Sequence, residues 1–226
     1  MGRLAVILGS SALGPGGEQI AAAAAEHGAA IVQRHDGAGG YVLPHRIDHE
    51  ANLRPLAEQG VDRVLAISSV GSLKPELSVG TLVCPDDFIA LHLDRSIFDD
   101  ARAHSAPSFD SELRGEAIAA WGESGQQPVD GGVYWQAIGP RFETPAEIRL
   151  MAVHADVVGM TVGSECVIAG ELGLAYAALC MVDNLANGLG PERLSVGELE
   201  RDRAANAALL RDGLEAVLPR LGAVGR

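Results

Sequence analysis

The sequence predicts a single α/β domain spanning residues 1–226, and three observations lead to this prediction. Short apolar runs typical of buried strands alternate with stretches of helical periodicity. The length of 226 residues suits one hydrophobic core, since single cores grow to roughly 250 residues before chains divide. The hydrophobic content of 47%, without internal repeats or a linker-like segment, excludes a disordered chain.

In the first half, we expect strands where apolar runs end at small residues and helices where glycine follows a periodic stretch. Gly28 and Gly60 are such helix stops, and Pro55 implies that its helix is kinked or begins late. The expected elements are a strand at 4–8, a helix at 20–27, a strand at 29–33, a helix at 47–59 and a strand at 61–69.

In the second half, two helix starts stand out. Thr144 is followed by Pro145 and then by Glu147, which is the spacing of a capping box with proline at the first helical position. Ser195 and Glu198 repeat the capping-box spacing before the last helix. The other expected elements are strands at 81–89, 133–138, 156–160 and 174–183 and helices at 113–121 and 164–172.

Charge and composition exclude several classes of protein. The net charge of −13 disfavours binding to nucleic acid or to anionic membranes, although a few donors can still hold a small anion. No apolar run reaches the roughly eighteen residues of a membrane span, and the amino terminus resembles a strand more than a signal peptide. Cys84, Cys166 and Cys180 are too widely spaced to suggest disulfides or a zinc site. We expect a soluble cytoplasmic protein that binds no metal.

The chemistry is expected where strands end, because ligands of open α/β sheets bind beyond the carboxyl ends of the strands. Turns rich in serine, together with the forked donor of Arg34, suggest a phosphate cradle. The first turn, GSSALG, is neither a P-loop nor a dinucleotide-binding turn. The residues at these strand ends are Ser10 and Ser11, Arg34 and His35, Ser68 to Gly71, Gly139 to Glu143, Met160 and Thr161, and Asp183 and Asn184.

Taken together, the motifs resemble the trimeric purine nucleoside phosphorylase and methylthioadenosine phosphorylase family, and most closely its methylthioinosine branch. The resemblance rests on the strings GSSAL, PHRIDHEANL, SSVGSL, GTLVCPDDF, GPRFETPAEI and ADVVGMT and on a later strand ending in Asp-Asn, in family order from Val6 to about Gly188. It implies a twisted, mixed, partly barrel-like sheet flanked by helices. It also implies a homotrimeric pentosyltransferase of purine salvage, in which inorganic phosphate attacks C1′ of a purine nucleoside without a cofactor or metal.

The resemblance also implies roles for individual residues. Phosphate contacts fall to Ser11, Arg34, His35, Ser68, Ser69 and Thr161, and nucleoside contacts to Val70, Gly71, Phe142, Glu143, Met160 and Asn184. His104 lies in a loop that resembles the one reaching a neighbouring subunit's sugar 5′ group, although a solvated loop histidine is the simpler interpretation.

The resemblance also implies a base preference, because Glu143 and Asn184, which we expect to be catalytic, match the carboxylate and the amide residue of the 6-oxopurine enzymes. A carboxylate at position 143 accepts from the N1–H of hypoxanthine or guanine, whereas adenine N1 has no proton and would face it repulsively. Asn184 can donate to N7 or O6. Because an unpaired buried polar group costs about 1–3 kcal/mol, this pair favours a 6-oxopurine nucleoside: inosine, guanosine or 5′-methylthioinosine.

The sequence also departs from the family pattern. Residues 39–41 replace a histidine expected before Pro44, and Gly163 and Ser164 replace an expected Val-Pro. Asp183 stands where related enzymes have a neutral residue. These departures bear on the phosphate geometry more than on the base site.

Structural interpretations remain open for several of these residues. Glu143 can serve the following helix N-terminus, and Asn184 can be a turn residue ending a strand. Arg34 and His35 can be a solvated strand end, while Phe142 and Met160 are ordinary core types. The alternative functions are a nucleoside hydrolase, in which water replaces phosphate, and a purine-binding protein without turnover.

Overall fold

The computed structural model describes residues 2–9, 17–36, 40–190 and 196–221, and its fold confirms the predicted α/β class. In this part of the chain, nine strands form one mixed sheet in the order β5-β7-β8-β3-β9-β4-β6, with β1 beside β3 and β2 beside β1. The strands are β1 (Arg3–Leu8), β2 (Ala30–Gln33), β3 (Val61–Ser72), β4 (Leu82–Cys84), β5 (Asp87–Ile89), β6 (Val129–Asp130), β7 (Val133–Gln136), β8 (Val157–Gly159) and β9 (Ala175–Leu185). The helices are α1 (Gly17–Glu26), α2 (His49–Glu58), α3 (Ser111–Glu123), α4 (Pro145–Met151), α5 (Val162–Glu171) and α6 (Val196–Leu221), with 3-10 turns η2 (Pro44–Arg46) and η3 (Ala101–Ala103).

Strand β3 is the centre of the sheet because it pairs with three other strands. β9 runs parallel to it along one edge. On the other edge, β1 runs parallel to its first half, and β8 pairs antiparallel with its last residues, Gly71 and Ser72. Two strands of opposite direction therefore follow one another along a single edge, and the sheet is curled, as the resemblance implied.

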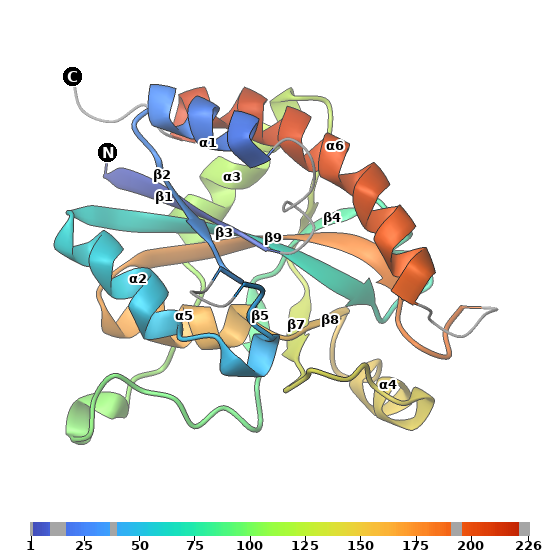
Figure 1. The fold of residues 1–226 in the computed structure, drawn as a ribbon. Helices are drawn as coiled ribbons and strands as arrows, with labels where there is room; N and C mark the ends of the chain where they lie inside the picture. The colour runs from blue at the N-terminus through green and yellow to red at the C-terminus, as the bar shows by residue number, and fades with distance from the viewer. Residues whose placement is uncertain (1, 10–16, 37–39, 191–195, 222–226) are drawn as a thin grey trace.

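Helices cover both faces of the sheet (Figure 1). α1, α3 and α6 pack on one face around a core that includes Trp121 and Leu214. α2 and α5 pack on the other face around a core that includes Leu53 and Val162. The short helix α4 closes a third, smaller core beside β8. Residues at or just beyond the carboxyl ends of β3, β8 and β9 contribute to this third core.

A β-bulge interrupts the pairing of β3 with β9. Val70 pairs with Val182, but the next residue, Gly71, pairs with Asn184, so Asp183 is the extra residue. A bulge bends the strand and redirects the side chains around it. The bulge therefore lies at Asp183 and Asn184, the Asp-Asn pair that ends a strand in the sequence analysis.

Most predicted elements are present, with differences that have local causes. The strand expected at 81–89 is broken after Cys84 into β4 and β5, because Pro85 cannot donate a ladder hydrogen bond. The short strand β6 was not predicted. The helix expected at 47–59 begins later, at His49, where the Asp48 carboxylate accepts from the amide of Ala51 at 2.9 Å.

The two expected helix starts have different outcomes. The capping box of Thr144 and Glu147 at the start of α4 is confirmed in both of its hydrogen bonds. The capping-box residue Ser195 lies outside the described residues, and α6 is described from Val196. Among the described helices, none has the length and apolar character needed to cross a bilayer.

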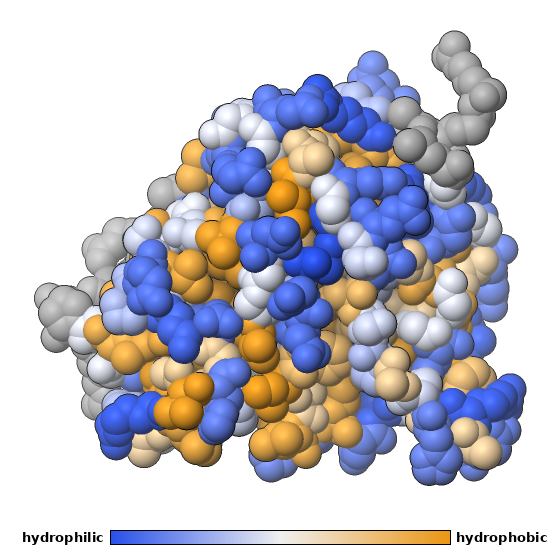
Figure 2. Space-filling view, turned by 180° about the vertical axis from the view of Figure 1, so that it is seen from behind, coloured by the Kyte–Doolittle hydropathy of each residue, from blue (hydrophilic) through white to orange (hydrophobic). Residues whose placement is uncertain are grey.

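The surface carries several large apolar side chains. Leu91 is 75% exposed and Val153 is 71% exposed, and Ile138 and Leu150 are also open to solvent. Figure 2 shows apolar side chains gathered along the lower part of the face seen from behind.

Candidate functional site

A pocket of about 690 Å³, its open mouth included, lies at the carboxyl ends of β3, β8 and β9. β3 contributes Ser68 to Gly71, and the turn after β8 contributes Met160 and Thr161. The complete lining is Arg34, His35, Tyr41, Pro44, Ser68, Ser69, Val70, Gly71, Phe142, Glu143, Val158, Gly159, Met160, Thr161, Asn184, Ala186 and Asn187. The strand ends thus converge on one cavity.

The pocket lining includes Phe142, Glu143 and Asn184, and Asn184 pairs with Gly71 near the carboxyl end of β3. Glu143 is buried, and this burial raises the pKa of its carboxyl above the ordinary value. Asn184 Nδ2 donates to the carbonyl of Leu185 at 2.9 Å, which fixes the orientation of the amide. Gly71 lies against this amide so closely that a Cβ there would be 3.2 Å from Asn184 Nδ2. Glycine at position 71 therefore keeps the pocket open beside Asn184.

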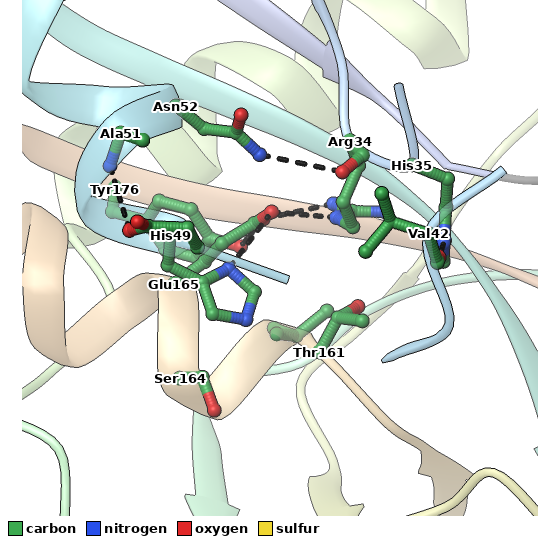
Figure 3. A network of polar contacts seen from close by, with 12 residues as sticks. Arg34, His35, Val42, His49, Ala51, Asn52, Thr161, Ser164, Glu165 and Tyr176 are labelled. Atoms are coloured by element: carbon green, nitrogen blue, oxygen red, sulfur yellow. Dashed lines mark hydrogen bonds and ion pairs between the residues drawn. The ribbon is translucent and has the colours of Figure 1, made fainter. Parts of the chain in front are cut away.

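Arg34, which also lines the pocket, belongs to a buried polar network (Figure 3). Its Nε and Nη2 donate to the two carboxylate oxygens of Glu165 at 2.5 and 2.8 Å, and Nη1 donates to the carbonyl of Ile67 at 3.0 Å. The Tyr176 hydroxyl also donates to Glu165, at 2.8 Å, and His49 Nδ1 lies 3.7 Å from the same carboxylate. Arg34 from the end of β2 is thereby tied to α2, α5 and β9.

The charges of this network stabilise one another. Burial disfavours the ionised form of both Arg34 and Glu165, but their proximity outweighs burial: the pKa of Arg34 is raised and that of Glu165 is lowered well below its usual range. The interpretation of Arg34 and His35 as a solvated strand end is wrong, because both side chains are buried. Arg34 reaches the pocket with its charge already balanced by Glu165.

His35 is held in place by two contacts. Its Nδ1 lies 2.8 Å from the carbonyl oxygen of Val42, so Nδ1 carries the proton, because a carbonyl can only accept. Its ring stacks on Tyr41, with ring centroids 4.8 Å apart and an interplanar angle of 8°. Tyr41 lies within the segment that lacks the family's expected histidine.

Thr161 precedes α5 and is buried at the pocket wall. Its side chain makes no capping hydrogen bond. Instead, the Tyr134 hydroxyl accepts from the backbone amides of Thr161 and Val162, at 3.2 and 3.4 Å. Because Tyr134 serves the start of the helix, the Thr161 hydroxyl is not needed there.

Asp183, at the bulge, is completely buried between β3 and α6. Ser69 Oγ donates to its Oδ2, and Asn206 Nδ2 donates to its Oδ1 at 2.7 Å. Asn206 Nδ2 also contacts the carbonyl of Val182 at 3.2 Å. Asp183, which stands where the family has a neutral residue, therefore accepts hydrogen bonds from two side chains in this structure.

Comparison with known proteins shows the superfamily to which the chain belongs. The sequence pattern of the phosphorylase superfamily matches residues 15–219. The chain belongs to the phosphorylase superfamily. It is 42% identical over 179 residues to a probable 6-oxopurine nucleoside phosphorylase of Archaeoglobus fulgidus, covering 79% of this chain and 73% of that protein. It is 40% identical over 172 residues to a probable S-methyl-5′-thioinosine phosphorylase of Methanothermobacter thermautotrophicus, covering 75% of this chain and 60% of that protein.

The fold of this superfamily member also matches solved structures. A methylthioadenosine phosphorylase from Schistosoma mansoni in complex with adenine superposes with a TM-score of 0.83. The sequence identity is 19%, and the superposition covers all of this chain and 93% of the other. The match confirms the predicted fold class.

In this superfamily member, every predicted site residue lines the pocket except Ser11 and His104. Ser11 lies outside the described residues, and His104 is exposed and is not part of the lining. The interpretation of Phe142 as an ordinary core residue is wrong, because its side chain is 39% exposed. The roles assigned to the lining residues remain predictions.

Sequence reasoning missed several members of the site. Tyr41, Pro44, Val158, Gly159, Ala186 and Asn187 also line the pocket, while Glu165, His49 and Tyr176 support it from behind. One signal was available for Glu165. A carboxylate that lies among apolar residues of a buried helix needs a cationic partner, and Arg34 was the cation expected nearby.

Proposed function

We propose that this chain is a purine nucleoside phosphorylase that acts on 6-oxopurine nucleosides: inosine, guanosine or 5′-methylthioinosine. The observation that carries the proposal is the joint presence of Glu143 and Asn184 in a pocket that is also lined by Arg34 and by Ser68, Ser69 and Thr161. The printed names of the relatives, a probable 6-oxopurine nucleoside phosphorylase and a probable S-methyl-5′-thioinosine phosphorylase, support it.

Glu143 and Asn184 would recognise the base. An ionised Glu143 accepts a hydrogen bond from the purine N1–H, which hypoxanthine and guanine carry and adenine lacks. Asn184 uses one N–H for the carbonyl of Leu185 and has a second with which to donate to N7 or O6. Since negative charge grows on the purine as the glycosidic bond breaks, this donor stabilises the transition state more than the ground state.

Phosphate would occupy the end of the pocket near Arg34, Ser68, Ser69 and Thr161. An oxygen of hydrogen phosphate bonds to C1′ as the bond from C1′ to N9 breaks, and the electron pair of that bond leaves with the purine. The purine takes up one proton, which balances the proton that the hydrogen phosphate gives up. Holding both reactants in one cavity supplies the proximity contribution. The products are the free base and ribose 1-phosphate, or methylthioribose 1-phosphate for the methylthio substrate. The reaction requires no covalent enzyme nucleophile, cofactor or metal.

We also propose that the chain acts in the cytoplasm as a homotrimer, with small molecules rather than nucleic acid or membranes as its partners. Exposed apolar side chains such as Leu91 and Val153 support burial against other subunits. Light scattering checks the assembly, and a stable monomer with full activity would contradict it.

The test of the base assignment is a pair of substitutions. Asn184→Asp replaces a donor by a carboxylate that repels O6, so turnover of inosine should fall by about 10²–10³ while adenosine turnover holds or rises. Glu143→Gln should weaken 6-oxopurine selection less, because the amide oxygen can still accept from N1–H. The measurements are kcat/KM for both nucleosides and the melting temperature.

Glu147→Gln is the matched control, because Glu147 lies four residues later, in the first turn of α4, and caps that helix without lining the pocket. If Glu143 and Asn184 serve only secondary structure, their variants will lose stability and keep the wild-type ratio of hypoxanthine to adenine turnover. Base release must also depend on phosphate. Equal rates without phosphate would indicate a hydrolase, and tight nucleoside binding without turnover would indicate a binding protein.

A further inference from the structure

We propose that Asp183 makes Ser69 a hydrogen-bond acceptor toward the pocket, so that the anion site selects protonated phosphate over sulfate. This inference rests on the proposed phosphate site and adds a specificity-determining residue to it. The proposal gives a chemical role to the acidic side chain at position 183, where related enzymes have a neutral residue.

The first step concerns the position of the carboxylate. Asp183 is the extra residue of the bulge between β3 and β9, and it is completely buried. Asn206 from α6 donates to Oδ1 and leaves Oδ2 directed toward Ser69. The helix thus holds one carboxylate oxygen, Oδ1, and the other oxygen, Oδ2, faces the strand that lines the pocket.

The second step concerns the single proton of Ser69. A serine hydroxyl has one O–H to donate and two lone pairs with which to accept. Ser69 Oγ donates that proton to Asp183, while the half-buried Ser69 also lines the pocket. The Ser69 hydroxyl therefore offers only lone pairs to whatever binds there.

The third step concerns the ligand. Phosphate near neutral pH keeps one or two protons and can donate to Ser69, whereas sulfate has none and would oppose lone pair to lone pair. The charge of Arg34 does not decide between the anions, because Glu165 already balances it. An acceptor left without a donor in a buried site costs binding affinity, so this one contact discriminates between two anions of similar size and shape.

The experiment compares phosphate with sulfate in the wild type and two variants. The quantity is the ratio of the inhibition constant of sulfate, measured against phosphate, to the KM of phosphate in phosphorolysis. Calorimetry with each inorganic anion gives the corresponding ratio of dissociation constants without turnover. In Asp183→Asn, the donor Asn206 should retain the amide oxygen, so the new NH₂ group faces Ser69 and releases the serine proton toward the pocket.

We expect the ratio of sulfate to phosphate constants to fall by about 10–100-fold in Asp183→Asn, because either anion can then accept from Ser69. Ser69→Ala should lower the same ratio chiefly by weakening phosphate. Glu116→Gln is the control, since it removes one negative charge from a partly buried pair with Arg63, at the opposite end of β3, and should leave the ratio unchanged.

Other results overturn the inference. If Asp183→Asn melts earlier but keeps the wild-type ratio, Asp183 only anchors α6. If the KM of the nucleoside changes instead of that of phosphate, Ser69 faces the sugar. Should Asp183→Asn fail to fold, Ser69→Ala carries the test, since it truncates a half-buried side chain by one atom. Base release by the wild type that ignores phosphate would remove the proposed function itself, which is a different outcome from phosphate-dependent release with an unchanged ratio.

Discussion

Replacing Glu165 by glutamine isolates the energetics of the buried network. The Arg34 and Glu165 side chains are 1% and 0% exposed, so solvent does not screen their interaction. Breaking such a pair leaves a buried charge without its partner and costs about 3–5 kcal/mol. Because the glutamine oxygen can still accept from Arg34, we expect the lower end, about 3 kcal/mol, and a fall of about 6–12 °C in melting temperature for a chain of this size.

The assay is urea unfolding with and without inorganic phosphate, and Glu50→Gln is the matched control. Glu50 pairs with Arg54 on the surface of α2, where both partners are more than 40% exposed, so its loss should cost less than about 1 kcal/mol. In Glu165→Gln, the Arg34 charge is no longer balanced, so phosphate should stabilise the variant more than the wild type.

The effect of Glu165→Gln also has a defined pH dependence. The folded-state pKa of Glu165 lies below its unfolded value of about 4.3, so its contribution to stability is complete above that pH. The stability difference between wild type and variant should therefore shrink as the pH falls below about 5. The reasoning is refuted if the variant loses less than 1 kcal/mol at neutral pH and gains no additional stabilisation from phosphate.

Two further predictions concern the base site and the core. Burial raises the pKa of Glu143, and the ionised carboxylate accepts from N1–H more strongly than the neutral acid does, so kcat/KM for inosine should fall on the acid side, with a midpoint above that of an ordinary glutamate. Glu143→Gln should abolish this acid limb, and its persistence would assign the limb to another group. Gly213→Ala would set a Cβ 2.6 Å from the buried ring of Trp121 and should destabilise the fold by about 1–3 kcal/mol in urea unfolding. Gly115→Ala, where a Cβ meets no neighbour within 4 Å, should be neutral or stabilising, and equal losses for both would contradict the packing argument.

The sequence was sufficient for most of the elements and for grouping most of the predicted site residues in one pocket. Apolar runs that end in small or polar residues identify strand ends, and the geometry of parallel sheets brings those ends together. Glu143 and Asn184, 41 positions apart, were found by this rule and line the same pocket. The capping box at Thr144 was equally predictable, because it depends only on neighbouring residues.

Tertiary hydrogen bonds could not be predicted in the same way. The partner of Arg34 lies 131 positions away on a helix, and only the packing of α5 against the sheet selects Glu165. The bonds of Asp183 depend on a bulge, which shifts the register of β9 by one residue and leaves no clear periodic signal. The break between β4 and β5 was visible in Pro85, but their different partner strands were not.

Two groups of residues that line the pocket lie on separate parts of the molecule. Phe142 and Glu143 belong to an irregular turn before α4, whereas Arg34 is locked by Glu165 into the packing between sheet and helices. With the roles proposed above, mutations in the turn would change the preferred nucleobase at little cost in folding, while mutations around Arg34 would carry a stability penalty. Divergence within a lineage of such chains should accordingly diversify the accepted bases while the second reactant stays the same.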